Sequence, residues 1–440
     1  MKLSKIFLPL IAATALTGCD SFLDIQPVGK VIPTTADEFR SLITEGYSNV
    51  PYDRGLTSFR TDEVLLDATM DANDLSSYLD IWRWNDTSSD ENTASFSWRT
   101  FYHVLFIANY TIESEKLMTD GSGDEIRQMV GEAYMLRALM HFNLVNLYAP
   151  AYTTCTPETT KAVPLKLDSD VESVLSRNTV AEVYKSILDD LDSAEEYLNT
   201  DTWETGYNYR FNTLSPDAMR SRVYLYMGKW EESLAASERV IAKHPQLSDI
   251  NTELPNAYNS VENIVALEQT MQSQYARTIK INRNFYSKFS STDLRRRAYF
   301  KQVTTSNITL VKGGSNTYSC TFRSGEMYLN AAEAAWHLGQ YDDARTYTEK
   351  IYAVRYTDGG AAKTAAIEAT DDTDVLDEIL EERARELAFE GHRWFDLRRN
   401  GQPRMERSYR GETYVLEQGD ARYTLRIPAE AITANPGLAE

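Results

Sequence analysis

The sequence predicts an all-α fold, a tetratricopeptide-like helical superhelix decorated by long irregular loops with minor β structure. Three observations support this prediction: apolar residues recur at helical spacing, two helical segments repeat each other, and long polar or aromatic-rich segments separate the helices. The expected helical stretches are 96–118, 124–148, 178–198, 215–243, 324–354 and 374–397. The longest expected loops are 49–95, 200–214 and 269–318. Ordered loops of this length are usually functional, which makes them candidate functional segments.

The N-terminal segment resembles a bacterial lipoprotein signal. Lys2 and Lys5 precede an apolar run that is too short to span a membrane as a helix. The stretch Leu16-Thr17-Gly18-Cys19 resembles a lipobox, in which the cysteine sulfur receives a diacylglycerol and becomes the new N-terminus. Each buried methylene of an acyl chain contributes about 0.8 kcal/mol, so two or three chains anchor a protein stably. An ordinary secreted protein with a chance cysteine is the alternative. The predicted segments are a signal peptide over 1–18, lipidation at Cys19 and a lipidated tether over 19–35.

A single helical domain is expected to follow the tether. Thr35 and Glu38 have the spacing of a capping box and predict the start of the first helix. We place the whole domain at 36–440, with an N-terminal half over 36–215 and a C-terminal region over about 216–440.

An internal repeat organises the predicted helices. The segments 223–241 and 334–352 align without a gap, so that Gly228 matches Gly339 and Trp230 matches Tyr341. A helix, a glycine turn, an aromatic residue and a second helix form the pattern of a tetratricopeptide unit. Such helix pairs stack into a solenoid, because one pair alone cannot bury its apolar face. Two unrelated helical hairpins are the alternative, and 131–148 is a candidate first helix of a further unit.

Charge and cysteine content restrict the partners. Removal of residues 1–18, which contain Lys2 and Lys5, changes the formal net charge from -20 to -22, and a strongly acidic chain repels nucleic acid. No later segment approaches 18 consecutive apolar residues, so the lipid anchor is the only predicted membrane attachment. Cys155 and Cys320 either pair or remain free buried thiols.

The sequence contains no recognisable catalytic motif. It has no G-x-S-x-G elbow, H-E-x-x-H pair, Gly-Lys phosphate loop or C-x-x-C pair. The acidic stretch 67–75 hints at calcium but lacks the glycine of a calcium loop, and we interpret it as a solvated loop. We therefore predict a protein that is not an enzyme and that needs no cofactor or metal, although a structural calcium remains open.

The segment 382–401 is the most distinctive in the chain. Its apolar residues recur at three- and four-residue steps and predict one amphipathic helix, with Glu and Arg paired on the opposite face. We expect the 382–399 helix, with Trp394, to be structural. Trp98 is likewise assigned to the core, and the run Arg295-Arg296-Arg297 to a helix surface or to ion pairing.

Five segments, taken in order, resemble the SusD/RagB family of outer-membrane nutrient-binding lipoproteins. These are 97–113, 131–152, 162–165, 323–344 and the C-terminal "ELAFEGHRWFDLRRNG". The resemblance implies several tetratricopeptide units and a surface export signal at Asp20 and Asp24. It also implies capture of nutrients, usually oligosaccharides, by a lid on a SusC-like TonB-dependent transporter, facing the cell exterior. The alternatives are the same role for oligopeptides and, less favoured, a surface hydrolase. With 440 residues the chain is shorter than many members, so its binding loops are expected to be reduced.

The family resemblance implies that ligand contacts come from loops outside the repeats. The first candidate is the segment 77–89, because tryptophan rings can pack on sugar faces while amide and carboxylate groups bind hydroxyls. The alternative is that its tryptophans seal the loop to the core. The segments 201–211 and 283–289 are the next candidates. The predicted ligand-binding residues are Trp82, Trp84, Asn85, Asp86, Tyr207, Tyr209 and Tyr286.

Overall fold

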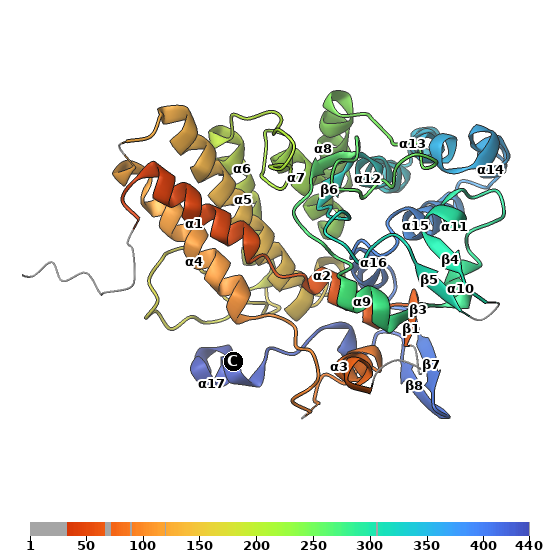
Figure 1. Ribbon diagram of the computed structural model, residues 1–440, viewed down its shortest axis with the longest axis horizontal. Helices are drawn as coiled ribbons and strands as arrows, with labels where there is room; N and C mark the ends of the chain where they lie inside the picture. Colours follow the sequence, from red (N-terminus) through yellow and green to blue (C-terminus); the bar gives the residue numbers. More distant parts are fainter. Residues whose placement is uncertain (1–32, 67–71, 89, 119, 305–306, 440) are drawn as a thin grey trace, which may run out of the picture.

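The computed structural model describes residues 33–66, 72–88, 90–118, 120–304 and 307–439. Helices dominate it, and consecutive helices pack side by side in one continuous array. In Figure 1 the array runs from α1 and α4 on the left, over α7 and α8 at the top, to α13 and α14 on the right. The all-α prediction is therefore confirmed. The predicted signal peptide, Cys19 and most of the tether lie outside the described residues.

The array consists of helices that follow one another along the chain, some joined by short turns and others by long loops. Its members are α1 (Ala36–Ser48), α4 (Arg99–Glu113), α5 (Gly123–Tyr148), α6 (Val180–Tyr197), α7 (Ser215–Met227), α8 (Trp230–Lys243), α12 (Ser324–His337), α13 (Tyr341–Arg355), α14 (Ala361–Glu368), α15 (Val375–Glu386) and α16 (Arg393–Arg399).

Local capping explains where several of these helices begin. Thr35 forms the predicted capping box: its side chain accepts from the backbone N–H of Glu38, whose carboxylate accepts from the backbone N–H of Thr35. Thr179 and Glu182 form the same arrangement at the start of α6. Each box satisfies donors that a helix end leaves unpaired.

The predicted repeat corresponds to two stacked helix pairs. α7 packs on α8 and α12 on α13, and α8 packs on α12 between them. Gly228 and Gly339 both adopt the left-handed conformation, with φ of 69° and 75°, within two residues of the end of the first helix of each pair. Glycine adopts this conformation without steric cost, which explains its place at both turns. α5, which contains 131–148, packs on α6 as a further pair.

The predicted continuous helix over 382–399 is wrong. α15 ends at Glu386, and a turn with Phe389 at φ 61° and Gly391 at φ 74° precedes α16. The apolar residues keep their i,i+4 spacing through this turn, so periodicity alone could not reveal the break between α15 and α16.

The glutamates of this segment are buried, whereas ordinary surface pairs were expected. Glu386 accepts hydrogen bonds from Arg295, Arg323 and Arg355 at 2.8–3.1 Å. Burial alone would raise the pKa of Glu386, but these guanidinium groups hold it well below its usual range. Arg295 therefore belongs to a buried ion-pair network that joins the loop layer to the helix array. The ion-pairing prediction for the 295–297 run is confirmed at this residue.

The remaining elements form a layer of loops, most of it along the lower and right-hand sides of the array in Figure 1, whereas β2 and β6 lie against α7. Its helices are α2 (Asp53–Leu56), α3 (Ala72–Trp82), α9 (Ser273–Thr278), α10 (Arg283–Tyr286), α11 (Arg295–Ala298) and α17 (Ala429–Ala434). Its strands are β1 (Val64–Leu66), β2 (Asn263–Val265), β3 (Ile279–Ile281), β4 (Phe300–Gln302), β5 (Ile308–Leu310), β6 (Phe322–Arg323), β7 (Met405–Tyr409) and β8 (Glu412–Leu416).

The strands form antiparallel two-stranded ladders, in which β1 pairs with β3, β2 with β6, β4 with β5, and β7 with β8. The expected minor β structure is confirmed. The largest apolar core lies among the helices of the array, and a second core lies beneath the loop layer.

Candidate ligand-binding groove

Two adjoining cavities form a groove where the helix array meets the loop layer. Their volumes are about 550 and 430 Å³, and Ser48 and Tyr52 line both. The groove lies at the end of α1 and the start of α2, with α9 on its other side. In Figure 1 these three elements meet near the centre of the molecule. The groove is therefore built from residues far apart in the sequence.

Tyrosine rings dominate the walls of the groove. The first cavity is lined by Tyr47, Tyr52, Tyr209 and Tyr258, and the second by Tyr52, Tyr78 and Tyr275. Tyr52, Tyr209, Tyr258 and Tyr275 are half-buried, so each is held by the protein while part of it faces the groove.

Contacts behind these rings hold them in position. Tyr47 is buried, donates to Glu132 at 2.9 Å and accepts the Phe211 N–H at 3.1 Å. Its ring meets the Tyr209 ring edge-on, with centroids 5.2 Å apart. Tyr275 is held in the same way against Tyr78, at 5.6 Å. The tyrosines thus form a pre-organised aromatic surface.

The other groove residues supply neutral hydrogen-bonding groups. Among the described residues that line it, none is a lysine, arginine or histidine, and the only carboxyl group belongs to Asp53. The polar side chains are Ser48, Asn49, Ser77, Ser95, Ser97, Thr100, Asn259, Gln272, Gln274, Asn316, Thr317 and Ser319. Hydroxyl and amide groups both donate and accept, which suits an uncharged polar ligand.

Asp53 lies in the wall of the second cavity without a cationic partner. Its carboxylate accepts the Ser97 N–H at 2.5 Å and the Ser97 hydroxyl at 3.1 Å. The neighbouring Arg54 pairs instead with Glu268 at 2.7 Å. Burial raises the pKa of Asp53 to about 7, against the lowering effect of the two Ser97 hydrogen bonds. The group therefore changes its charge near neutral pH.

The structure corrects the prediction for Trp82 and Trp84. Their exposed fractions are 1% and 0%, and their indole N–H groups donate to the carbonyls of Val64 and Arg60. The Arg407 guanidinium lies over both rings, 5.0 Å from Trp82 and 4.1 Å from Trp84. Rings enclosed in this way offer no surface to a ligand, so both tryptophans seal the loop to the core.

The other predicted site residues lie in different places. Tyr209 lines the groove, and Tyr207 is exposed beside it, with ring centroids 6.4 Å apart. Asn85 and Asp86 line a third cavity of about 560 Å³, where Asp86 pairs with Arg60 at 2.6 Å. Tyr286 is buried and lines a separate cavity, where its hydroxyl accepts from Arg296 at 3.1 Å. The structure thus does not bring the seven predicted residues into one site.

Sequence reasoning missed most of the groove. Three of the groove tyrosines lie within the long predicted loops: Tyr52 and Tyr78 in 49–95, and Tyr275 in 269–318. Tyr258 lies between the predicted helical stretch 215–243 and the loop 269–318. The high tyrosine content, 27 residues, was the available signal. It could not show which rings converge, because that depends on packing between distant segments.

Cysteine and metal sites do not contribute to the groove. Cys155 and Cys320 are both free in the structure. The described residues contain no group of three histidine, cysteine or acidic side chains arranged to hold a metal ion. The acidic stretch 67–75 lies partly outside the described residues. Within the described ranges, every helix is too short or too polar to cross a bilayer.

Comparison with protein families gives two overlapping matches. Residues 201–439, more than half of the chain, match the model of the SusD family. Residues 21–225 match a second model, described as starch-binding associating with outer membrane.

Curated relatives are similar over parts of their length. A SusD-like protein from Formosa agariphila is 24% identical over 247 residues, which are 55% of this chain and 46% of that protein. A SusD-like protein from Bacteroides ovatus is 27% identical over 237 residues, 51% of this chain and 40% of that protein. The chain thus spans less than half the length of the curated relatives it matches.

Solved structures share the fold over most of the chain. A SusD superfamily protein from Bacteroides thetaiotaomicron has a TM-score of 0.78 and 24% identity, covering 92% of this chain and 99% of that one. A laminarin-binding SusD-like protein has a TM-score of 0.64 and 18% identity, covering 83% and 92% of the two chains.

Proposed function

Because the chain belongs to the SusD family, we propose that it captures neutral oligosaccharides at the cell surface in the tyrosine-lined groove. It does so as a lipid-anchored lid of a SusC-like TonB-dependent outer-membrane transporter, which then imports the ligand. The observation that supports this function best is the chemistry of the groove: converging tyrosine rings, neutral polar side chains and no cation among its described lining residues.

The groove chemistry favours sugars over peptides. The C–H face of a sugar ring packs on an aromatic ring, and its hydroxyls need groups that both donate and accept. An oligopeptide carries a terminal carboxylate, for which the described lining residues offer no cation. A relative of the same fold is named as laminarin-binding, which supports a glycan ligand.

We propose capture without chemical change. Hydrolysis of a glycosidic bond ordinarily needs two carboxyl groups that flank the bond. Asp53 is the only carboxyl group among the described lining residues of the groove. The protein therefore binds its ligand and leaves it intact.

Calorimetry on the purified protein tests the function. Neutral oligosaccharides are titrated beside acidic oligosaccharides and a peptide digest, and each ligand is analysed afterwards for cleavage. Tyr209→Ala and Tyr258→Ala each remove a half-buried ring from the groove and are expected to weaken binding of the neutral sugar. Loss of ring stacking, at about 0.5–1.5 kcal/mol, corresponds to about 2- to 12-fold weaker binding.

Tyr207→Ala is the matched control, because this ring is exposed and lies outside the groove lining. Wild-type affinity in both groove variants would remove the groove from the proposal. Binding of the peptide digest alone would favour the oligopeptide role, and time-dependent cleavage would contradict capture altogether.

A further inference from the structure

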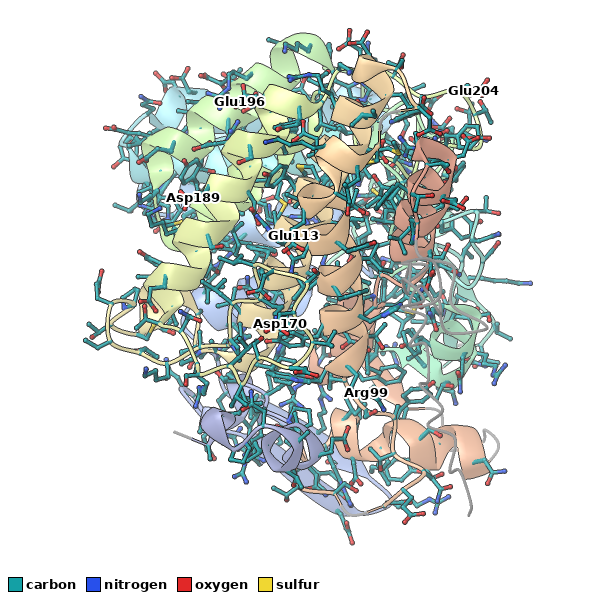
Figure 2. The ribbon with its side chains drawn as sticks, turned by 90° about the vertical axis from the view of Figure 1, so that its left-hand side faces the viewer. Arg99, Glu113, Asp170, Asp189, Glu196 and Glu204 are labelled. Atoms are coloured by element: carbon teal, nitrogen blue, oxygen red, sulfur yellow. The ribbon has the colours of Figure 1, made fainter. Side chains whose placement is uncertain are left out.

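The groove does not end at its second cavity. The third cavity shares Ala94 and Ser95 with the groove, and a fourth cavity of about 1200 Å³ shares Glu430 with the third. The fourth cavity lies between α4, the loop 164–175 and α17. In Figure 2, Arg99 marks the foot of α4 above α17, and Asp170 marks the neighbouring loop. Neighbouring cavities that share lining residues thus extend from the groove to the side of the molecule where α4 faces α17.

The fourth cavity is lined by an aromatic ladder that begins at Trp98, the N-cap of α4, and continues along the first turns of the helix. Trp98, Tyr102 and Phe106 are spaced four residues apart, so they lie on one face at a rise of about 6 Å per step. All three are half-buried. Trp98 was assigned to the core on its helical position, and the structure corrects this: the residue packs against the core on one side and lines a cavity on the other.

Contacts behind the ladder fix its first two rings. The Trp98 and Tyr102 centroids are 5.2 Å apart, and Trp98 meets the edge of Tyr148 at 5.1 Å. The Tyr102 hydroxyl donates to the Pro164 carbonyl at 3.0 Å. These rings are therefore pre-organised, as the groove tyrosines are.

Two donors lie beside the ladder, the indole N–H of the half-buried Trp98 and the guanidinium of the exposed Arg99. Ser173 and Asn435 add a hydroxyl and an amide to the cavity lining. The ladder thus combines ring faces with hydrogen-bonding groups, the combination that a sugar requires.

The third cavity, between the two aromatic surfaces, has four carboxyl groups and one guanidinium among its described lining residues. It is lined by Asn85, Asp86, Ser88, Asp90, Glu91, Thr93, Arg426 and Glu430, among others. Carboxylates accept hydrogen bonds from hydroxyls but repel uronic acids and sulfates. The connecting passage therefore suits a neutral polyhydroxylated chain.

We propose that the ladder is a distal subsite for the same ligand, which is a linear chain of neutral sugar rings long enough to reach from the groove to Trp98. This inference rests on the proposed function and specifies its substrate class. Tethering two sites through one chain raises affinity without a new contact at either site. Val171 and Val174 are exposed at 80% and 77% on the loop beside the ladder, which a docked protein would also cover. Continuity with the groove favours the ligand chain as the occupant.

Affinity as a function of chain length tests the inference. The full chain is titrated with a series of one neutral homopolymer, from disaccharide to long oligosaccharides. The wild type should show a second rise in affinity once the chain reaches the ladder, of about 2- to 12-fold for one stacked ring. Trp98→Ala should abolish this second rise and leave the affinity for the shortest binding oligomer unchanged.

A second variant, which blocks the fourth cavity, tests the subsite independently of any folding defect in Trp98→Ala. Ala434→Trp adds bulk at an exposed residue that lines the fourth cavity and removes no packing. Ala429→Trp is its control, because Ala429 is exposed on the same helix but does not line the cavity. The inference predicts that Ala434→Trp abolishes the second rise of affinity with oligosaccharide length and that Ala429→Trp retains this rise.

The possible failures are distinguishable. A second rise that persists in both Trp98→Ala and Ala434→Trp, or one that is absent from the wild type, overturns the distal subsite and leaves the groove intact. Variants that keep all sugar affinities but lose association with a transporter overturn it in favour of a protein-docking surface. The proposed function itself fails instead if no oligosaccharide binds, and the groove is removed from it if both Tyr209→Ala and Tyr258→Ala have no effect at any length.

Discussion

At the scale of single residues, Asp53 makes stability depend on pH. Its pKa is raised by burial from 3.8 to about 7, and the groups around it are Ser97, Tyr148 and Tyr275, with no paired cation. Between these two values the folded protein holds a proton that the unfolded chain has lost. The contribution of Asp53 to the free energy of unfolding is therefore largest below about pH 4 and is lost as pH rises through about 7. Asp53→Asn should remove this pH-dependent loss of stability. At pH 8 the loss that it removes amounts to about 2–4 kcal/mol in the free energy of unfolding.

Thermal unfolding of the wild type and Asp53→Asn from pH 5 to 8.5 measures this effect. Glu63 provides a matched comparison, because burial raises its pKa to about 7 as well, and it lies outside the groove lining. Glu63→Gln should also flatten the stability profile, but only Asp53→Asn should change the pH dependence of ligand affinity. Parallel profiles for wild type and Asp53→Asn would show that Asp53 is ionised throughout.

Trp394 is expected to be structural. It is 1% exposed, stacks on Tyr423 at 5.0 Å, and has the Arg60 guanidinium 4.9 Å from its ring. Trp394→Ala should destabilise the protein by about 3–5 kcal/mol, as other large-to-small core changes do. Urea unfolding measures the loss, with the half-buried Trp336→Ala as a control that should lose less. Full stability combined with lost sugar binding would reassign Trp394 to the site.

Residue identity alone could not separate packing from binding in this protein. Trp82 and Trp84 have the composition of a sugar platform, but Arg407 covers both, and it lies more than 300 residues away in the sequence. Trp98 shares a helical face with core residues, yet it borders a cavity formed with α17. Both differences arise from long-range contacts, which sequence periodicity does not encode.

At the scale of elements, helix positions were predictable and one helix break was not. Periodicity located the helices of the array except α14, which lies between the predicted stretches 324–354 and 374–397, and capping residues located the start of α1. The turn between α15 and α16 is imposed by tertiary contact: a Cβ at Gly391 would lie 2.8 Å from the Arg54 Cβ and 3.0 Å from its carbonyl oxygen. α2 therefore packs directly on this turn, and α2 also carries Asp53 of the groove.

Gly391→Ala tests this contact. The change combines left-handed strain of about 1–2 kcal/mol with a clash against the backbone of α2, so the loss should exceed the strain alone. Gly401→Ala isolates the strain, because φ is also positive there and nothing lies within 4 Å of the added Cβ. Chemical denaturation compares the two. Equal losses would mean that α2 moves away freely and that the turn does not support the groove.

At the scale of the whole molecule, the charge distribution disfavours anionic ligands. The formal net charge of the full chain is -20, and Figure 2 shows Glu113, Asp170, Asp189 and Glu196 distributed over one face. An acidic surface field lowers the local concentration of anionic polymers. The overall charge and the groove chemistry therefore both disfavour anionic ligands, although only the overall charge could be obtained from the sequence.

The position of the molecule in the cell depends on residues outside the described ranges. The stretch Leu16-Thr17-Gly18-Cys19 resembles a lipobox, and we propose that Cys19 carries the acyl chains that hold the protein at the outer membrane. Cys19→Ala removes the attachment point, and the described helices offer no other means of crossing the bilayer. The variant should therefore lose lipid labelling and leave the membrane fraction.

Fractionation of cells grown with a labelled fatty acid measures both effects. Cys155→Ala is the matched control, because Cys155 is a free, half-buried thiol in the folded domain and its loss should leave labelling and localisation unchanged. Surface exposure is measured separately, by protease treatment of intact cells. Retention of the Cys19→Ala variant in the membrane without label would mean that a protein partner, rather than a lipid, holds the chain there. A transporter-deletion strain would then decide between that partner and non-specific adhesion.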